Sequence, residues 1–112
     1  MDQDRARALL ATERRRVEDL IDQARLDADS DRDEANEPGD LADPAERLTA
    51  AEGDDAVLEG LEARLQAIGR AETRLRDGTY GRSVRSGLPI PDPRLEADPA
   101  AELTVEEAAE RT

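Results

Sequence analysis

The segment PAERLTAAEGDDAVLEGLEARLQAIGRAETRLRD, residues 44–77, decides the fold. Its large apolar residues recur at alternating spacings of three and four, with Glu72 as the one interruption: Leu58, Leu61, Leu65, Ile68 and Leu75. This spacing puts them on one stripe of a helix and is typical of a coiled-coil seam. At ~1.5 Å per residue the helix would be about 50 Å long.

The two ends of this segment carry the signals that begin and end a helix. Asp43 is a good N-cap, Pro44 suits the first helical position, and Glu46 follows the cap by three residues. At the other end, Asp77-Gly78 supplies a stop signal. The sequence therefore predicts a helix from Pro44 to Asp77.

A second apolar stripe precedes this helix. Leu10, Val17 and Ala24 recur every seven residues, with Leu20 and Ile21 beside them. The pattern predicts a helix from about Asp4 to Asp29, capped by Asp2 or Asp4.

The apolar pattern fades after Asp29, and Glu37-Pro38-Gly39 is a helix-breaking sequence. Two one-sided stripes joined by a break predict a long antiparallel helical hairpin over residues 1–77. A largely disordered acidic chain is the alternative that the low aromatic content, 1%, leaves open.

Negative charge is concentrated around the predicted turn of the hairpin. The chain carries a net charge of −13, and residues 27–55 contain twelve acids and two arginines, which gives −10. Phosphates would repel such a surface, so direct nucleic-acid binding is disfavoured. A basic cleft on a partner protein is the natural target of an acidic tip at about residues 30–45.

The remainder, residues 78–112, predicts a small separate lobe. It has four prolines and a low content of large apolar residues, among which Tyr80 is expected in the core. Asp92-Pro93 predicts a capped short helix through Ala97, and Thr104-Val105-Glu106-Glu107 is a capping box that opens a last helix. A unit this small needs a metal or support from the helices.

Composition excludes several classes of function. The chain has no cysteine and no histidine, so a Cys/His zinc site cannot form, and no cofactor is expected. It also lacks a nucleophile–base pair and a glycine-rich phosphate loop, which argues against an enzyme. No apolar run approaches the ~18 residues of a membrane span, and no signal-peptide pattern follows Met1, so a monomeric cytoplasmic protein is expected.

The C-terminal part resembles the DksA/TraR (DnaK suppressor) family across about residues 56–107. That family typically shows GTYG, CxxCG, RLEAxP and CxxC in this order. Here the same order is carried by Gly78-Thr79-Tyr80-Gly81, Ser83-Val84-Arg85-Ser86-Gly87, Pro89-Ile90 and Arg94-Leu95-Glu96-Ala97-Asp98-Pro99.

The resemblance places the family's four zinc ligands on residues that are not cysteines: Ser83, Ser86, Thr104 and Glu107. It therefore implies a degenerate zinc-finger-like lobe that has lost its metal. Because Thr104 and Glu107 are also the ends of the capping box, their hydrogen bonds are a candidate replacement for the metal. Plain decay of an unused site is the alternative.

The resemblance also covers the hairpin tip, where the family carries DxxDxA. Asp40, Asp43 and Ala45 occupy its defined positions. In the family this tip enters the secondary channel of RNA polymerase, approaches the active-site magnesium region and alters open-complex stability, often together with the alarmone ppGpp. The implied partner is thus RNA polymerase, while alarmone dependence is doubtful because the chain lacks the extended N-terminal region of longer members.

Three other interpretations of these residues stay open. Asp43 alone is explained as a helix cap worth ~1 kcal/mol. The paired acids Asp40 and Asp43 would recruit magnesium only if a partner supplied more ligands. The competing function is a structural coiled-coil adaptor, or a degenerate paralogue, whose partner is not polymerase.

Overall fold

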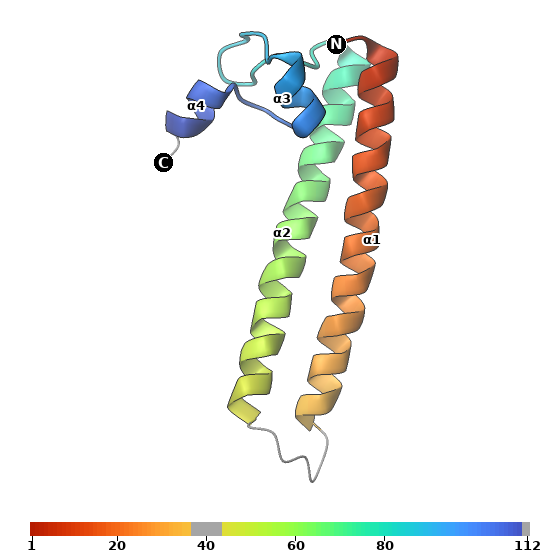
Figure 1. Cartoon of the computed structure of the whole chain (residues 1–112), viewed down its shortest axis with the longest axis vertical. Helices are drawn as coiled ribbons and strands as arrows, with labels where there is room; N and C mark the ends of the chain where they lie inside the picture. Colours follow the sequence, from red (N-terminus) through yellow and green to blue (C-terminus); the bar gives the residue numbers. More distant parts are fainter. Residues whose placement is uncertain (37–43, 111–112) are drawn as a thin grey trace. The chain divides into compact units, whose positions relative to one another are not determined.

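The computed structural model describes the backbone of residues 1–36 and 44–110 and the side chains of residues 1–30 and 53–110. Four helices account for most of these residues: α1 (Gln3–Asn36), α2 (Pro44–Asp77), α3 (Asp92–Ala97) and α4 (Val105–Glu110) (Figure 1). Within this part of the chain, extended pairing is limited to an isolated antiparallel bridge between Arg82 and Pro89. The predicted mainly α fold class, with two long helices that pack together, is confirmed.

The first helix begins as predicted but ends later. The backbone N–H of Arg5 donates to the Asp2 carboxylate at 2.7 Å, so Asp2 caps α1. The helix runs on to Asn36, which corrects the predicted end at Asp29. The fading apolar pattern shows where the buried stripe of the helix ends, and the helix itself continues. It can continue because the first helix-breaking residue after Asp29 is Pro38.

The second helix has the predicted bounds, Pro44–Asp77. At its end the Thr79 N–H donates to the Arg74 carbonyl at 2.9 Å, and Gly78 adopts a φ of +85°. This is a Schellman stop, which glycine makes without steric cost. The predicted cap, Asp43, lies outside the described residues.

The chain forms two compact units, each of which contains part of both long helices. One unit comprises Met1–Arg15 and Gln66–Thr112, and the other comprises Arg16–Leu65. In each unit the α1 and α2 segments lie side by side and run in opposite directions (Figure 1). The boundary predicted between residues 77 and 78 stays a prediction.

Alanines and larger aliphatic residues form the seam of these helices. Those of α1 that are at most 9% exposed follow the alternating spacing of three, four and seven: Ala6, Leu10, Val17, Ile21, Ala24 and Ala28. From α2, Ile68 and Ala71 are fully buried. Leu20 is 41% exposed, whereas the adjacent Ile21 is 4% exposed, so Ile21 belongs to the seam and Leu20 lies at its edge. No helix in the described residues is long and apolar enough to span a membrane.

The interruption of the α2 stripe at Glu72 is explained by an ion pair. Arg14 on α1 donates from Nε to one Glu72 carboxylate oxygen at 3.1 Å and from Nη2 to the other. Both side chains are about one-third exposed, so neither charge is fully desolvated. The acid at a seam position is thus compensated within its own unit.

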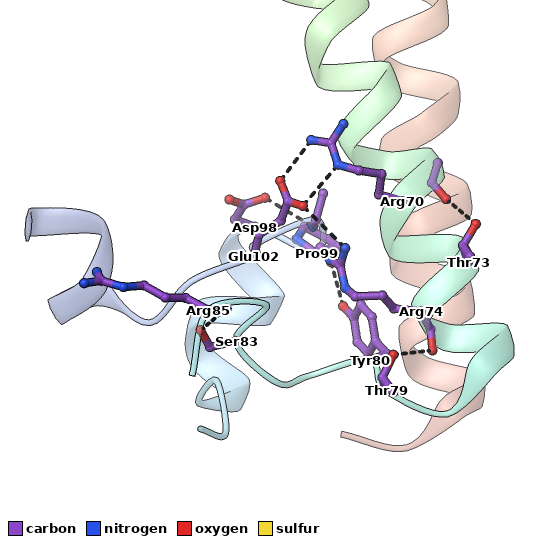
Figure 2. Close-up of polar contacts among 12 residues, drawn as sticks. Arg70, Thr73, Arg74, Thr79, Tyr80, Ser83, Arg85, Asp98, Pro99 and Glu102 are labelled. Carbon is purple, nitrogen blue, oxygen red and sulfur yellow. Dashed lines mark hydrogen bonds and ion pairs between the residues drawn. The ribbon is translucent and has the colours of Figure 1, made fainter. Parts of the chain in front are cut away.

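The C-terminal region, residues 78–110, packs on a small apolar cluster. Ile90, Leu95 and Ala101 form its buried centre, against which Met1 and Tyr80 pack. The Tyr80 hydroxyl donates to the Pro99 carbonyl at 2.8 Å, which confirms Tyr80 as a core residue (Figure 2). This hydrogen bond satisfies the polar end of a half-buried ring.

The short helix α3 confirms one prediction and corrects another. It covers Asp92–Ala97 as expected, but Pro91 occupies the N-cap position and no side chain caps the helix. Asp92 is therefore the first helical residue and not the cap. Pro93 has no N–H, and the N–H of Arg94 donates to the Pro91 carbonyl at 3.0 Å, so these positions need no side-chain acceptor.

Candidate functional site

The polar interior of the C-terminal region coincides with residues singled out from the sequence. Among the residues whose side chains the structure describes, the buried polar ones are Ser83, Thr104 and Glu107, with exposures of 5%, 7% and 9%. Ser86, the fourth predicted position, is exposed. Buried polar groups need hydrogen-bond partners, so the contacts of these residues define what the site can do.

The hydroxyl of Ser83 organises a tight turn over residues 83–88. Its Oγ accepts the backbone N–H of Arg85 at 3.1 Å and that of Ser86 at 3.2 Å. The turn closes where the Ser83 N–H donates to the Leu88 carbonyl at 2.8 Å. Gly87 has a φ of +77°, a backbone conformation that favours glycine.

The start of α4 has the predicted capping box. The backbone N–H of Thr104 donates to the Glu107 carboxylate at 3.0 Å, and the Glu107 N–H donates to the Thr104 hydroxyl at 3.2 Å. These reciprocal bonds satisfy two backbone donors that a helix start leaves without intrahelical partners. The box predicted from Thr104 and Glu107 is confirmed.

Groups of both the turn and the capping box lower the pKa of the Glu107 carboxyl. Its pKa falls to about 2, first because of the Thr104 backbone N–H and then because of the Ser83 hydroxyl, with further contributions from the hydroxyls of Ser86 and Thr104. Burial opposes this shift. Hydrogen bonds to a carboxylate favour its charged form, so these donors point at an ionised Glu107. We call Ser83, Ser86, Thr104 and Glu107 the Glu107 cluster.

The donor set of the Glu107 cluster does not fit zinc. Zinc sites in proteins use thiolates, imidazoles and carboxylates, whereas this cluster offers three hydroxyls and one carboxylate. The lone pairs of Ser83 and Thr104 already accept backbone N–H groups. Over the part of the chain that the structure describes, no three Asp or Glu side chains gather to bind a metal.

A second set of polar contacts joins the C-terminal region to α2. Arg70 donates from Nε and Nη2 to the two carboxylate oxygens of Glu102, at 3.1 and 2.9 Å (Figure 2). Arg74, one turn further along α2, lies 3.5 Å from the same carboxylate. Its side chain is 14% exposed, so most of it is shielded from solvent.

Sequence reasoning missed Glu102 and the role of Arg94. Arg94 Nε donates to the Leu103 carbonyl at 2.8 Å. The arginine of the RLEA motif therefore holds the backbone segment that leads to α4. The i,i+4 spacing of Arg70 and Arg74 puts both arginines on one helix face and indicates that an acid could pair with both. The spacing does not identify that acid, because Glu102 is distant in sequence.

The contacts described above do not include the predicted tip residues Asp40, Asp43 and Ala45. Asp40 and Asp43 lie outside the described residues. Ala45 is the second residue of α2, and its side chain also lies outside them.

The chain is similar to two known proteins, although no family model matches it. General stress protein 16O of Bacillus subtilis is 39% identical over 70 residues, which cover 62% of this chain and 43% of that protein. The solved structure of transcription factor DksA2 from Pseudomonas aeruginosa matches with a TM-score of 0.79 and 31% identity. That match covers 97% of this chain and 81% of the DksA2 chain, so it includes the helix pair and the C-terminal region.

Proposed function

This chain belongs to the DksA-like family, and from that membership we propose that it regulates transcription initiation by binding RNA polymerase. The observation that carries the proposal is the match to a DksA transcription factor over 97% of the chain. A likeness limited to two long helices would fit many adaptors. This likeness extends through the C-terminal region as well.

In the proposed mechanism the acidic end of the hairpin, which comprises the end of α1, the connecting segment and the start of α2, enters the secondary channel of polymerase. Residues 27–55 carry a net charge of −10, which favours encounter with a basic channel and opposes direct contact with nucleic acid. Asp40 and Asp43 make the polar contacts there, and the small side chain of Ala45 permits close approach. The protein acts by binding and not by catalysis, as a cytoplasmic monomer.

The C-terminal region has a separate part in this proposal. Residues 78–110 are anchored on α2 by the contacts of Glu102 with Arg70 and Arg74. We assign to residues 1–77 the insertion into polymerase and to residues 78–112 the support of the hairpin base.

The test is an in vitro transcription assay with purified polymerase. The variant Asp40→Asn/Asp43→Asn should need at least about tenfold more protein for the same effect on initiation, because charged contacts are lost. The control is Asp19→Asn/Asp22→Asn, which has the same spacing and charge change on exposed residues of α1. Circular dichroism should show equal helicity in both variants.

Two results would separate polymerase binding from the adaptor alternative. Polymerase should bind the wild-type chain in a pull-down and release it when another secondary-channel factor is added. If the tip variant kept full activity while substitutions of the seam leucines abolished it, the adaptor would be the better explanation.

A further inference from the structure

We propose that an open groove at the base of the helix pair binds a small organic anion that has an apolar body. The groove lies between the start of α1 and the end of α2, two segments of one compact unit that run side by side (Figure 1). Its volume is about 610 Å³. Small-molecule sites have volumes of about 300–1,000 Å³, so the groove is large enough for such a ligand. The proposal does not rest on polymerase binding, because the acidic end of the hairpin takes no part in it.

The floor of the groove is apolar. Leu10 and Leu75 come from the seam of the two helices, and Ala11 follows Leu10 on α1. Leu10 is buried and Leu75 is partly buried, whereas Ala11 is exposed and carries only a methyl group. The side chains of the protein therefore leave space between the helices here, and a bound apolar group would remove exposed carbon from water.

Two arginines on the rim give the groove positive charge. Arg76 Nη2 donates to the neutral hydroxyl of Thr73 at 3.3 Å, and within the described residues no carboxylate pairs with Arg76. Arg7 pairs with Asp4 at 3.1 Å, but both side chains are mostly exposed, so this ion pair is weak and readily exchanged for a ligand. An anionic group in the groove could thus pair with both guanidinium groups.

Neither the nearby acid nor the C-terminal region blocks the groove. Glu72 also lines it, but Arg14 donates to both oxygens of the Glu72 carboxylate and so compensates its charge. The C-terminal region is attached to α2 through Arg70 and Arg74. Each residue turns a helix by about 100°, so Arg76 lies about 200° around α2 from Arg74. The groove therefore opens on a different face of α2 from the one that the C-terminal region contacts.

The floor and the rim together define the class of ligand. The overall charge of −13 repels anions at long range, so the arginines alone would hold an inorganic anion only weakly. A neutral apolar molecule would gain nothing from the arginines. A molecule with one anionic group and an aromatic or aliphatic body contacts both parts of the groove, and burial of its apolar body supplies the additional affinity.

The first experiment titrates the full chain with anilinonaphthalene sulfonate, a fluorescent probe with one sulfonate and an aromatic body. Binding should saturate at about one probe per chain. The variant Arg7→Gln/Arg76→Gln should weaken binding at least about tenfold, because two charge-assisted contacts are lost. The control Arg15→Gln/Arg82→Gln removes the same charge from exposed residues outside the groove and should change binding less than about twofold. Equal losses, or no saturable binding by the wild type, would overturn the proposal.

A second pair of variants tests the floor. Ala11→Glu puts a carboxylate into the groove, whereas Ala8→Glu puts one on an exposed residue of α1 that does not line it. Ala11→Glu should weaken probe binding at least about tenfold, and Ala8→Glu less than about twofold. Circular dichroism should show equal helicity in both. If Ala11→Glu bound the probe as tightly as the wild type does, the proposal would be wrong.

Competition and NMR test the ligand class and its place. Decanoate should displace the probe, and inorganic sulfate at the same concentration should not. Amide shifts caused by the probe should concentrate in residues 3–11 and 72–76. Equal displacement by sulfate would reduce the groove to a cationic patch, and shifts concentrated in residues 84–103 would place the probe elsewhere. Either result would contradict the proposal.

Discussion

The helix pair and the C-terminal region are stabilised in different ways. The seam of α1 and α2 repeats contacts between alanines and larger aliphatic residues, and on α1 the described part of it extends from Ala6 to Ala28. The C-terminal region has one apolar cluster around Leu95 and one polar cluster around Glu107. Stability is therefore distributed along the helices and concentrated at two residues in the C-terminal region.

The difference shows what each region requires of its sequence. A repeated seam tolerates a small residue at almost any one position, which agrees with the alanines at positions 6, 24, 28 and 71. A region with a single apolar centre has no second contact to compensate for a lost one. We expect substitutions of equal size to have unequal effects in the two regions.

The largest effect is expected from Leu95→Ala. Leu95 is 1% exposed at the centre of its cluster, so truncation should lower the free energy of unfolding by about 3–5 kcal/mol through lost burial and a cavity. Leu88→Ala is the control, since Leu88 is 58% exposed in the same region, and it should change stability by less than about 0.5 kcal/mol. Urea denaturation measures both. Equal losses would show that Leu95 is not the centre.

A smaller effect is expected from Ile21→Ala in the seam. Ile21 is 4% exposed, and its loss should cost about 2–3 kcal/mol because the neighbouring seam contacts remain. The adjacent Leu20 is 41% exposed, so Leu20→Ala should cost less than about 1 kcal/mol. Thermal unfolding followed at 222 nm compares the two. If Leu20→Ala were the more damaging change, the assignment of the seam would be wrong.

Acid should loosen the C-terminal region through Glu107. Its pKa is lowered from about 4.5 to about 2, so its contribution to stability is complete above the higher value and is lost as the pH falls towards the lower one. An NMR titration of the Glu107 carboxyl carbon measures the midpoint. Ser86→Ala should raise the pKa of Glu107, since one hydroxyl donor is removed. A wild-type midpoint near 4.5 would contradict the cluster.

The smallest effect is expected at the link between α2 and the C-terminal region. Arg70 is 54% exposed, so its ion pair with Glu102 is screened by water. Arg70→Gln should cost about 0.2–1 kcal/mol, and the cost should shrink further at high salt. Denaturation of this variant at low and high salt is the measurement. A loss above about 2 kcal/mol would mean that the link carries more of the stability than its exposure indicates.

The sequence predicted the helices where local chemistry determines them. Pro44 and Asp77-Gly78 mark the bounds of α2, and the capping box marks the start of α4, because caps and stops act within one turn. The end of α1 was missed, since the fading apolar stripe reports burial and not helicity. Asp92 was misassigned as a cap because Pro91 occupies the cap position.

The candidate site was predictable only in part, for a different reason. The bonds between Thr104 and Glu107 follow from their spacing of three. The approach of Ser83 and Ser86 to the same carboxylate depends on the packing of distant residues, and only the family resemblance indicated it. The partner of Arg70 and Arg74 was not predictable, because Glu102 lies in a loop whose position the apolar cluster fixes.

The ion pair between Arg14 and Glu72 also contributes to the lengthwise alignment of the two long helices. Seams rich in alanine are nearly equivalent after a shift by one heptad, so apolar contacts alone specify the alignment weakly. A shift of one heptad in one direction would bring Ile21 to the place of Arg14 and leave Glu72 against an apolar residue, whereas the opposite shift would bring Arg7 there. The ion pair thus penalises slippage of the hairpin in one direction.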